Sequence, residues 1–195
     1  MNNTELEIIF IRHGSTEYNR THKYLGRKDE PLCDLGIQQA QERFSVGVPQ
    51  VDRVFSSPLI RCVQTARIVF PEHEPVIVPN FIEIDFGRFE GRTHEELYAD
   101  DPAYRIWIEG TGTNDSLEIP GGETRGQLTA RSVRGFYDML EQCGSCSRVA
   151  AAVHSGTIMA VVSSLMKPHK EFYDCYIGNC ATWAFKWDGK NLLPL

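Results

Sequence analysis

The stretch Leu6–Gly14, LEIIFIRHG, decides how the rest of the chain is interpreted. Its first six residues are an apolar run, interrupted only by Glu7, of the kind that forms a buried β-strand. The run ends in Arg12 and His13, and the glycine that follows lets the backbone turn sharply. Open α/β sheets bind ligands beyond the carboxyl ends of their strands. The stretch therefore predicts a strand that delivers a cation and a histidine to a binding site, although a strand that simply ends in polar residues would look the same.

A second stretch repeats this order. Arg148–His154, RVAAAVH, is another short apolar run that ends in histidine. A serine and a glycine follow it, and then the apolar segment Thr157–Met166. If the two strands are parallel neighbours in one sheet, His13 and His154 reach the same edge on the same side. Two histidines placed in this way can act as a nucleophile and as a partner that binds charge.

Strand and helix patterns alternate along the rest of the chain, which predicts an α/β fold. We expect a three-layer sandwich, with a mostly parallel central sheet, helices on both faces and a small cap insertion. The other expected strands are 52–55, 76–78, an edge strand 182–187 and a short terminal strand after the turn at Asp188-Gly189. The expected helices are 34–44, 59–70, 93–99, 102–109 and 124–141, besides the apolar segment after the second histidine. Asp34 is the expected N-cap of the first helix, and the serines of Ser56-Ser57-Pro58 are expected to cap the second.

Length and charge limit the possible functions. With 195 residues the chain is long enough for one domain with a sizeable core, and we expect a single domain 1–195 with a cap-like insertion at about 86–122. The formal net charge of −6 argues against nucleic acid and anionic membranes as partners. A small phosphorylated metabolite remains possible, because a few arginines in a cleft can outweigh a weakly acidic surface. Whether the protein is a monomer or a homodimer is left open.

Targeting signals and cysteines suggest a compartment. Met1–Glu5 lacks the basic and apolar parts of a secretory signal, and no apolar run reaches membrane-spanning length, so a cytoplasmic location is expected. A zinc site could be imagined at Cys143 and Cys146 or at Cys175 and Cys180. The first pair falls at a predicted helix end and the second has looser spacing, so reduced free thiols and no bound metal are expected.

Five short motifs, in order along nearly the whole chain, resemble the histidine phosphatase superfamily, whose fold is also called phosphoglycerate-mutase-like. The motifs are Arg12-His13-Gly14 with Thr16 and Asn19; Ser56-Ser57-Pro58 with Arg61 and Thr65-Ala66; Glu83 to Gly87 with Glu90-Gly91; Gly121-Gly122-Glu123; and His154-Ser155-Gly156. Each motif alone is weak, but five in this order are specific.

The resemblance implies a two-step phosphoryl transfer without cofactor or metal. His13 would attack phosphorus and Glu83 would protonate the departing oxygen. Water would then cleave the phosphoenzyme, with the same carboxyl acting as base. The phosphoryl oxygens would be held by Arg12, Asn19, Arg61 and His154.

These implied roles make physical sense. Preorganised guanidinium and imidazolium donors stabilise the charge on a transferring phosphoryl group, and the planar fork of arginine matches phosphate oxygens. Neighbouring cations disfavour the imidazolium form of His13 and keep it nucleophilic. Glu83 must hold a proton in the first step, so we expect its pKa to be raised by burial or by the substrate.

Several residues have simpler explanations that the structure has to test. Arg61 could be a helix-surface arginine in an ion pair. Asp85 and Glu90 share a segment with Glu83 and compete with it for the acid role. The remaining histidines match no motif, and we interpret them as surface or packing residues; they are His22, His73, His94 and His169.

The leaving group is less well defined. Aromatic residues in a cap most often serve packing, but several of them over a phosphate pocket would suit a flat apolar group; the residues concerned are Phe81, Phe86, Tyr98, Tyr104 and Trp107. With Tyr24-Leu25-Gly26-Arg27, the compact chain is most similar to the alpha-ribazole phosphatase and broad-specificity branch. Phosphoglycerate mutase is the alternative, although Ser15 replaces the acidic residue usual in mutases. A module that binds phosphorylated ligands without catalysis is the other alternative. Such a module could lose His13 or Glu83 while retaining the arginines; both residues are present here, so catalysis is predicted.

Overall fold

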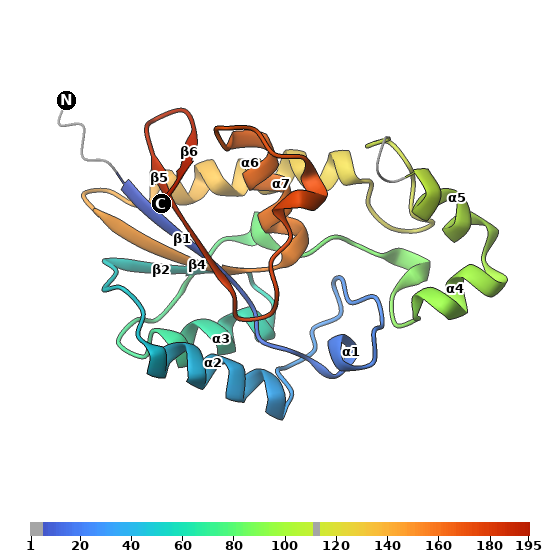
Figure 1. Ribbon diagram of the computed structural model, residues 1–195, viewed down its shortest axis with the longest axis horizontal. Coiled ribbons are helices and arrows are strands. Elements are labelled where there is room, and N and C mark those ends of the chain that lie inside the picture. Colours follow the sequence, from blue (N-terminus) through green and yellow to red (C-terminus); the bar gives the residue numbers. More distant parts are fainter. Residues whose placement is uncertain (1–5, 111–113) are drawn as a thin grey trace.

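One six-stranded sheet organises the computed structural model, which describes residues 6–110 and 114–195 (Figure 1). The expectations for Met1–Glu5 and for positions 111–113 of the expected cap insertion lie outside the described residues. The strands are β1 (Leu6–Arg12), β2 (Arg53–Ser56), β3 (Val76–Ile77), β4 (Arg148–Val153), β5 (Thr182–Trp187) and β6 (Leu192–Pro194), in the order β3-β2-β4-β1-β5-β6. Strands β1 to β4 pair in parallel, and β5 and β6 are antiparallel to their neighbours. The prediction that β5 lies at an edge was wrong, because the chain turns back after it and β6 takes that position.

Helices cover both faces of the sheet, as the sequence predicted. Side chains of α2 (Asp34–Val46) and α3 (Ile60–Val69) share a core with Ile9 and Ile11 of β1. On the opposite face, α6 (Arg125–Glu141) and α7 (Ser155–Leu165) share a core with Ile8 and Phe10. The two helix pairs lie on either side of the strands in Figure 1. Successive residues of a strand point to opposite faces, so β1 is apolar almost throughout because it is buried on both faces.

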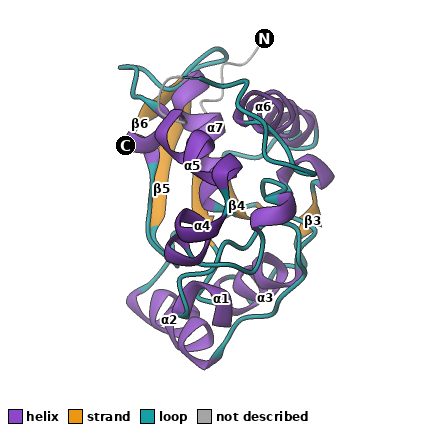
Figure 2. Ribbon diagram, turned by 90° about the vertical axis from the view of Figure 1, so that its right-hand side faces the viewer, coloured by secondary structure: helices purple, strands orange, loops and turns teal. Residues whose placement is uncertain are grey.

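A third apolar cluster lies beyond the sheet. It is built on α4 (His94–Asp100), α5 (Pro102–Gly110) and the short 3₁₀ helix η2 (Gly87–Phe89). Tyr104 and Phe89 are its fully buried rings, and Leu128 of α6 joins it to the main body. Figure 2 shows the molecule from the right-hand side of Figure 1, and in this view α4 and α5 lie in front of the sheet. The remaining short elements are α1 (Glu17–Arg20), η1 (Pro79–Phe81) and η3 (Phe172–Cys175).

Three details at helix starts differ from the predictions. Cys33 is the N-cap of α2, and Asp34 is the first helical residue, where its negative charge still favours the helix N-terminus. Helix α3 begins at Ile60 with Leu59 as N-cap, so the serines do not cap it. The loop after β1 contains the unpredicted helix α1, which begins with a capping box between Thr16 and Asn19. A single-turn helix is too short to produce a visible apolar period.

Candidate active site

The carboxyl ends of β1, β2 and β4 bring three polar residues together. His13 follows β1, Ser57 follows β2 and His154 follows β4. The backbone N–H of His13 donates to the Val153 carbonyl at 3.0 Å, which extends the parallel pairing by one residue. The rings of His13 and His154 therefore lie side by side, with centroids 5.2 Å apart and planes at 64°. Both histidines thus reach the same edge of the sheet, as the sequence predicted.

His13 is held in one tautomer. Its Nδ1 lies 2.7 Å from the Gly14 carbonyl oxygen, which can only accept, so Nδ1 carries the proton and Nε2 keeps its lone pair. Burial lowers the pKa of His13 well below its usual value, and the charges of Arg61 and Arg12 lower it further. The ring is therefore neutral near pH 7, with Nε2 free to act as a nucleophile.

Gly14 is required by a close backbone approach. A Cβ at this position would lie 2.5 Å from the carbonyl oxygen of Gly36 at the start of α2. The Gly14 N–H donates to Thr65 Oγ1 on α3 at 3.0 Å. The loop that carries His13 is thus fixed to both helices on that face of the sheet.

Two buried guanidinium groups flank the histidines. Arg61 is fully buried and donates to the carbonyls of Lys28 and Gly26, at 2.9 and 2.7 Å. Arg12 donates through Nη1 to Tyr176 Oη at 2.7 Å and to a backbone carbonyl. Within the described residues, the buried Nε of each arginine has no hydrogen-bond partner, and neither arginine forms an ion pair. The surface ion pair considered for Arg61 is therefore wrong, and two buried cations without a direct ion pair favour binding of an anion.

His154 is the N-cap residue of α7 and is fully buried. Its Nε2 lies 2.7 Å from Ser57 Oγ, and the Cys62 sulfur lies 3.4 Å from the same nitrogen. Burial first, and then Arg61 and His13, lower the pKa of His154 well below its usual value. The ring is thus neutral without substrate, rather than the imidazolium expected from the sequence, because it is buried among other positive or potentially positive groups. A phosphate dianion would shift the balance back toward the charged form.

The carboxyl group of Glu83 reaches the same site from the segment after η1. Its Oε1 accepts from the Ile84 N–H at 2.8 Å, and its Oε2 accepts from the Gly156 N–H of α7 at 3.2 Å. Burial raises the pKa of Glu83, although these two hydrogen bonds and Arg61 oppose the shift. Burial thus displaces the two pKa values in opposite directions, so that His13 is kept neutral and Glu83 retains its proton to higher pH.

The two competing carboxylates are engaged elsewhere. Asp85 accepts from the Gly87 N–H at 2.8 Å and pairs with Arg27 at 3.4 Å. Glu90 accepts from the backbone N–H groups of Gly26 and Lys28, at 3.0 and 2.8 Å. Of the three acids, Glu83 alone lines the cavity that opens between α7 and the aromatic residues of the cap segment.

A cavity of about 370 Å³ opens beside these groups. Arg12, Asn19 and Glu83 contribute to its polar part, and the aromatic part is formed by Tyr24, Phe86, Trp107, Phe172, Tyr173 and Tyr176. His13, Arg61 and His154 are not lining residues and lie almost wholly buried next to it, with exposed fractions of 4%, 0% and 0%. The structure therefore gathers all six predicted residues in one place, three on the cavity wall and three directly behind it.

The aromatic residues predicted to form the cap have different positions. Phe86 and Trp107 line the cavity, whereas Phe81 belongs to the core between the sheet and α6. Tyr98 is exposed. Tyr104 is buried, and its Oη lies 2.6 Å from Tyr24 Oη and 2.7 Å from His94 Nδ1. His94 is exposed and contacts the Tyr104 hydroxyl, which agrees with the expected surface or packing role, and with His22 it borders a neighbouring cavity of about 420 Å³.

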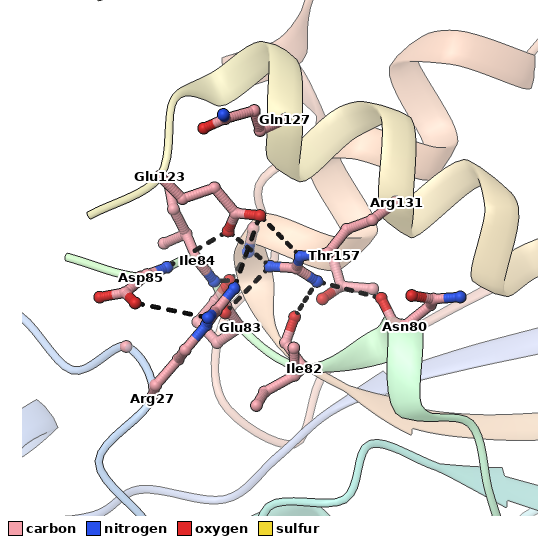
Figure 3. A network of polar contacts seen from close by, with 12 residues as sticks. Arg27, Asn80, Ile82, Glu83, Ile84, Asp85, Glu123, Gln127, Arg131 and Thr157 are labelled. Atoms are coloured by element: carbon pink, nitrogen blue, oxygen red, sulfur yellow. Dashed lines mark hydrogen bonds and ion pairs between the residues drawn. The ribbon is translucent and has the colours of Figure 1, made fainter. Parts of the chain in front are cut away.

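Sequence analysis missed several residues around the site. Tyr176 and Asn179 come from the segment before β5, where Tyr176 accepts from Arg12 and Asn179 donates to the His13 carbonyl at 2.9 Å. Ser155 Oγ is buried without a partner at the first turn of α7. Arg131 of α6 contacts the segment that carries Glu83 (Figure 3). Most of these contacts involve backbone groups or single side chains, which leave no motif in the sequence.

The six cysteines are free thiols in the structure. Among residues 6–110 and 114–195, no three histidine, cysteine or acidic side chains come together as a metal site would require. In the same part of the chain, no helix is long and apolar enough to cross a bilayer.

Comparison with known proteins gives a consistent result. A family model for the histidine phosphatase superfamily (branch 1) matches residues 8–193. The adenosylcobalamin/alpha-ribazole phosphatase of Escherichia coli (strain K12) is 30% identical over 189 residues, which cover 94% of this chain and 86% of that protein. The glucosyl-3-phosphoglycerate phosphatase of Mycolicibacterium vanbaalenii is 31% identical over 170 residues, covering 82% and 73%.

Solved structures agree on the fold. The crystal structure of the alpha-ribazole phosphatase from Shigella flexneri superposes with a TM-score of 0.85 and covers 97% of this chain and 95% of that one. Its sequence identity is 24%, so this similarity concerns the fold alone.

Proposed function

The chain belongs to the histidine phosphatase superfamily, and on that premise we propose that it hydrolyses phosphomonoesters through a phosphohistidine at His13. The observation that carries this proposal is the tautomer of His13. Its proton is held on Nδ1 by the Gly14 carbonyl, while Nε2 stays unprotonated beside two arginines whose Nε groups have no hydrogen-bond partner. Such an arrangement suits attack on phosphorus and has no evident structural purpose. It also argues against a module that only binds phosphorylated ligands.

In the first step, the Nε2 lone pair of His13 forms a bond to phosphorus while the bond between phosphorus and the ester oxygen breaks. Glu83 donates its proton to that departing oxygen. In the second step, Glu83 takes a proton from water, the water oxygen bonds to phosphorus, and the bond between phosphorus and nitrogen breaks. Inorganic phosphate leaves, and both side chains return to their starting protonation states.

Charge on the equatorial oxygens is stabilised by preorganised donors. We assign this role to Arg12, Arg61 and His154, with Asn19 adding a hydrogen bond. The unpartnered Nε groups of the two arginines and the unpartnered Ser155 hydroxyl support this assignment, because a phosphoryl group would supply the missing acceptors. The site requires no metal for this chemistry, since its positive charge comes from protein side chains.

For the substrate we propose alpha-ribazole 5'-phosphate, in the assembly of the cobalamin nucleotide loop. Two observations support it: the name of the Escherichia coli relative, and the aromatic wall of the cavity, where Tyr24, Phe86 and Trp107 can pack on a flat ring. The alternative within the same activity is a small-molecule phosphatase of broad specificity. Phosphoglycerate mutase is disfavoured, because a small acid would leave this aromatic wall uncovered.

The domain organisation, the cellular location and the oligomeric state are also proposals. We assign the segment at about 86–122 the role of a cap over the leaving group, within a single domain. We place the protein in the cytoplasm, where its thiols would stay reduced. A monomer and a homodimer both remain compatible with the site.

The test is phosphate release from alpha-ribazole 5'-phosphate, 3-phosphoglycerate, p-nitrophenyl phosphate and common sugar and nucleotide monophosphates, with His13→Ala as the blank. A kcat/KM that is much larger for alpha-ribazole 5'-phosphate supports the assigned substrate. A flat profile indicates a general phosphomonoesterase, and isomerisation of 3-phosphoglycerate indicates a mutase. Absence of hydrolysis across the panel contradicts the proposed activity.

A further inference from the structure

Arg131 of α6 holds the backbone of the segment that carries Glu83 (Figure 3). Its Nη1 donates to the carbonyl oxygen of Asn80 at 3.0 Å and to that of Ile82. Its Nη2 donates to the carbonyl oxygen of Glu83 itself at 3.0 Å. One guanidinium group therefore fixes the peptide units on both sides of the Glu83 Cα.

The other edge of the same guanidinium binds Glu123. Arg131 Nε donates to Glu123 Oε1 at 2.8 Å, and Nη2 donates to Oε2 at 2.7 Å. Glu123 in turn pairs with the backbone of Asp85, since the Glu123 N–H donates to the Asp85 carbonyl at 2.9 Å and Oε2 accepts from the Asp85 N–H at 3.3 Å. The five N–H bonds of the guanidinium are matched by five acceptor contacts. Arg131 and Glu123 together thus hydrogen-bond to the backbone immediately before and after Glu83.

These hydrogen bonds connect the Glu83 segment to the helices that cover the sheet. Arg131 belongs to α6, whose Phe136 and Met139 share a core with Ile158 and Val161 of α7. Helix α7 carries Gly156, whose N–H binds the Glu83 carboxylate. Arg131 therefore sets the distance between the Glu83 backbone and the helix N-terminus that orients its carboxyl group.

We propose that Arg131 is a positioning residue for the general acid, an inference that rests on the proposed function. Arg131 does not itself line the cavity, and its hydrogen bonds go to backbone carbonyls of the Glu83 segment and to Glu123. Proton transfer requires the carboxyl group to lie within hydrogen-bond reach of the departing oxygen, and a displacement of about 1 Å can reduce a rate by roughly 10²-fold. Loss of Arg131 would therefore weaken protonation of the leaving group while the nucleophile and the cations stay in place.

The experiment measures kcat/KM for Arg131→Met over a series of phosphate esters, from p-nitrophenyl phosphate through phenyl phosphate to alkyl phosphates. This constant reports steps up to formation of the phosphoenzyme, so it isolates the step that Glu83 assists as an acid. We expect a loss of about tenfold or more for alkyl esters and less than about threefold for p-nitrophenyl phosphate, whose leaving group needs little protonation. Activity on p-nitrophenyl phosphate also verifies that the variant is folded.

Arg134→Met is the matched control, because Arg134 lies one turn further along α6 with 79% of its side chain exposed. We expect it to behave as wild type across the whole series. Arg131→Lys keeps a positive charge next to Glu123, but a single ammonium cannot reach three carbonyls, so we expect an intermediate dependence on the leaving group. If Arg131→Met does not fold, the Lys variant decides the question.

Equal losses for good and poor leaving groups would show a purely structural role and overturn the inference. A wild-type profile for Arg131→Met, or for Arg131→Lys when Met does not fold, would overturn it as well. Failure of the proposed function is distinguishable, because wild-type protein would then hydrolyse none of the esters.

Discussion

At the scale of single residues, one physical cause prepares both reacting groups. Burial disfavours the charged form of any side chain, so it lowers the pKa of His13 and raises the pKa of Glu83. The Nε2 atom of the nucleophile is thereby kept unprotonated, and Glu83 retains its proton to a higher pH than an exposed carboxyl group does. No metal is needed to create this pair of protonation states.

The pH dependence of kcat/KM follows from these two shifts. Activity should rise as His13 loses its proton, at a pH well below the usual histidine pKa, and should fall as Glu83 loses its proton, at a pH above the usual carboxyl pKa. Glu83→Gln should remove the alkaline limb while the acid limb stays. A pH series on both proteins measures this, and an alkaline limb that survives the substitution would assign it to another group.

Glu83→Gln should also change the response to the leaving group. Without a proton to donate, we expect roughly 10²- to 10⁴-fold lower kcat/KM for alkyl phosphates and a much smaller loss for p-nitrophenyl phosphate. Asp85→Asn provides the comparison, because Asp85 lies two residues away and does not line the cavity. Similar losses for Glu83→Gln on both kinds of ester would remove Glu83 from the acid role.

Residue types that carry chemistry were predictable, whereas residues that support them were not. His13, His154 and the arginines follow recognisable patterns at strand ends and helix starts. Arg131 acts on backbone carbonyls, which every residue possesses, so nothing in the local sequence distinguishes it from an exposed arginine such as Arg134. The neutral state of His154 likewise depends on how densely the cations pack around it.

At the scale of elements, parallel pairing explains why two distant motifs form one site. The register of β1 and β4 places Arg12 opposite Val153, so the next residue of each strand is a histidine. These two strands and most helices were predictable because they are long and periodic. Single-turn helix α1 and the order of β5 and β6 were not, since neither short elements nor edge positions produce a strong pattern.

Helix α7 should tolerate no side chain at Gly156. A Cβ there would lie 2.3 Å from Glu83 Oε1, so Gly156→Ala must push the carboxyl group away from its N–H donor. We expect kcat/KM for alkyl phosphates to fall by about tenfold or more, with good leaving groups affected less. Gly178→Ala is the control, because a Cβ at that position meets no atom within 4 Å. Unchanged activity of Gly156→Ala on alkyl phosphates would mean that the rate does not depend on the position of the Glu83 carboxyl group.

At the scale of the whole molecule, one sheet supports two cores and a separate apolar cluster. The two cores fix the strand ends that carry the histidines and cations. The third cluster supports the aromatic wall, which would face the leaving group in the proposed function. Chemistry and specificity can therefore be changed separately.

Phe86 should affect substrate choice more than chemistry. It lines the cavity and packs against Tyr24 and Trp107, with ring centroids 4.9 and 6.3 Å away. We expect Phe86→Ala to lower kcat/KM for esters with a flat aromatic base by about two- to tenfold, which corresponds to the roughly 0.5 to 1.5 kcal/mol of one ring contact. Ethyl phosphate should be affected little. Tyr98→Ala, in the same segment but exposed and away from the cavity, should leave both values unchanged. Equal losses of kcat/KM for both kinds of ester in Phe86→Ala would contradict a role of Phe86 in substrate choice.

The core on the α6 and α7 face should dominate stability. Phe10 is fully buried between Phe136 and Phe185, with ring centroids 6.4 and 6.2 Å away. Phe10→Ala should reduce the free energy of unfolding by about 3 to 5 kcal/mol, whereas Phe44→Ala, at an exposed position, should change it by about 0.5 kcal/mol or less. Urea denaturation of the two variants measures the difference, and similar values would contradict the assigned core.

The most direct test of the central claim is to quench the enzyme during turnover and locate the phosphoryl group on the protein by peptide mass spectrometry. We predict an acid-labile, alkali-stable phosphohistidine at residue 13, which is absent from His13→Ala and accumulates when water attack is slowed in Glu83→Gln with p-nitrophenyl phosphate. Turnover without a phosphoenzyme, or with the phosphoryl group on His154 or another residue, would contradict the account.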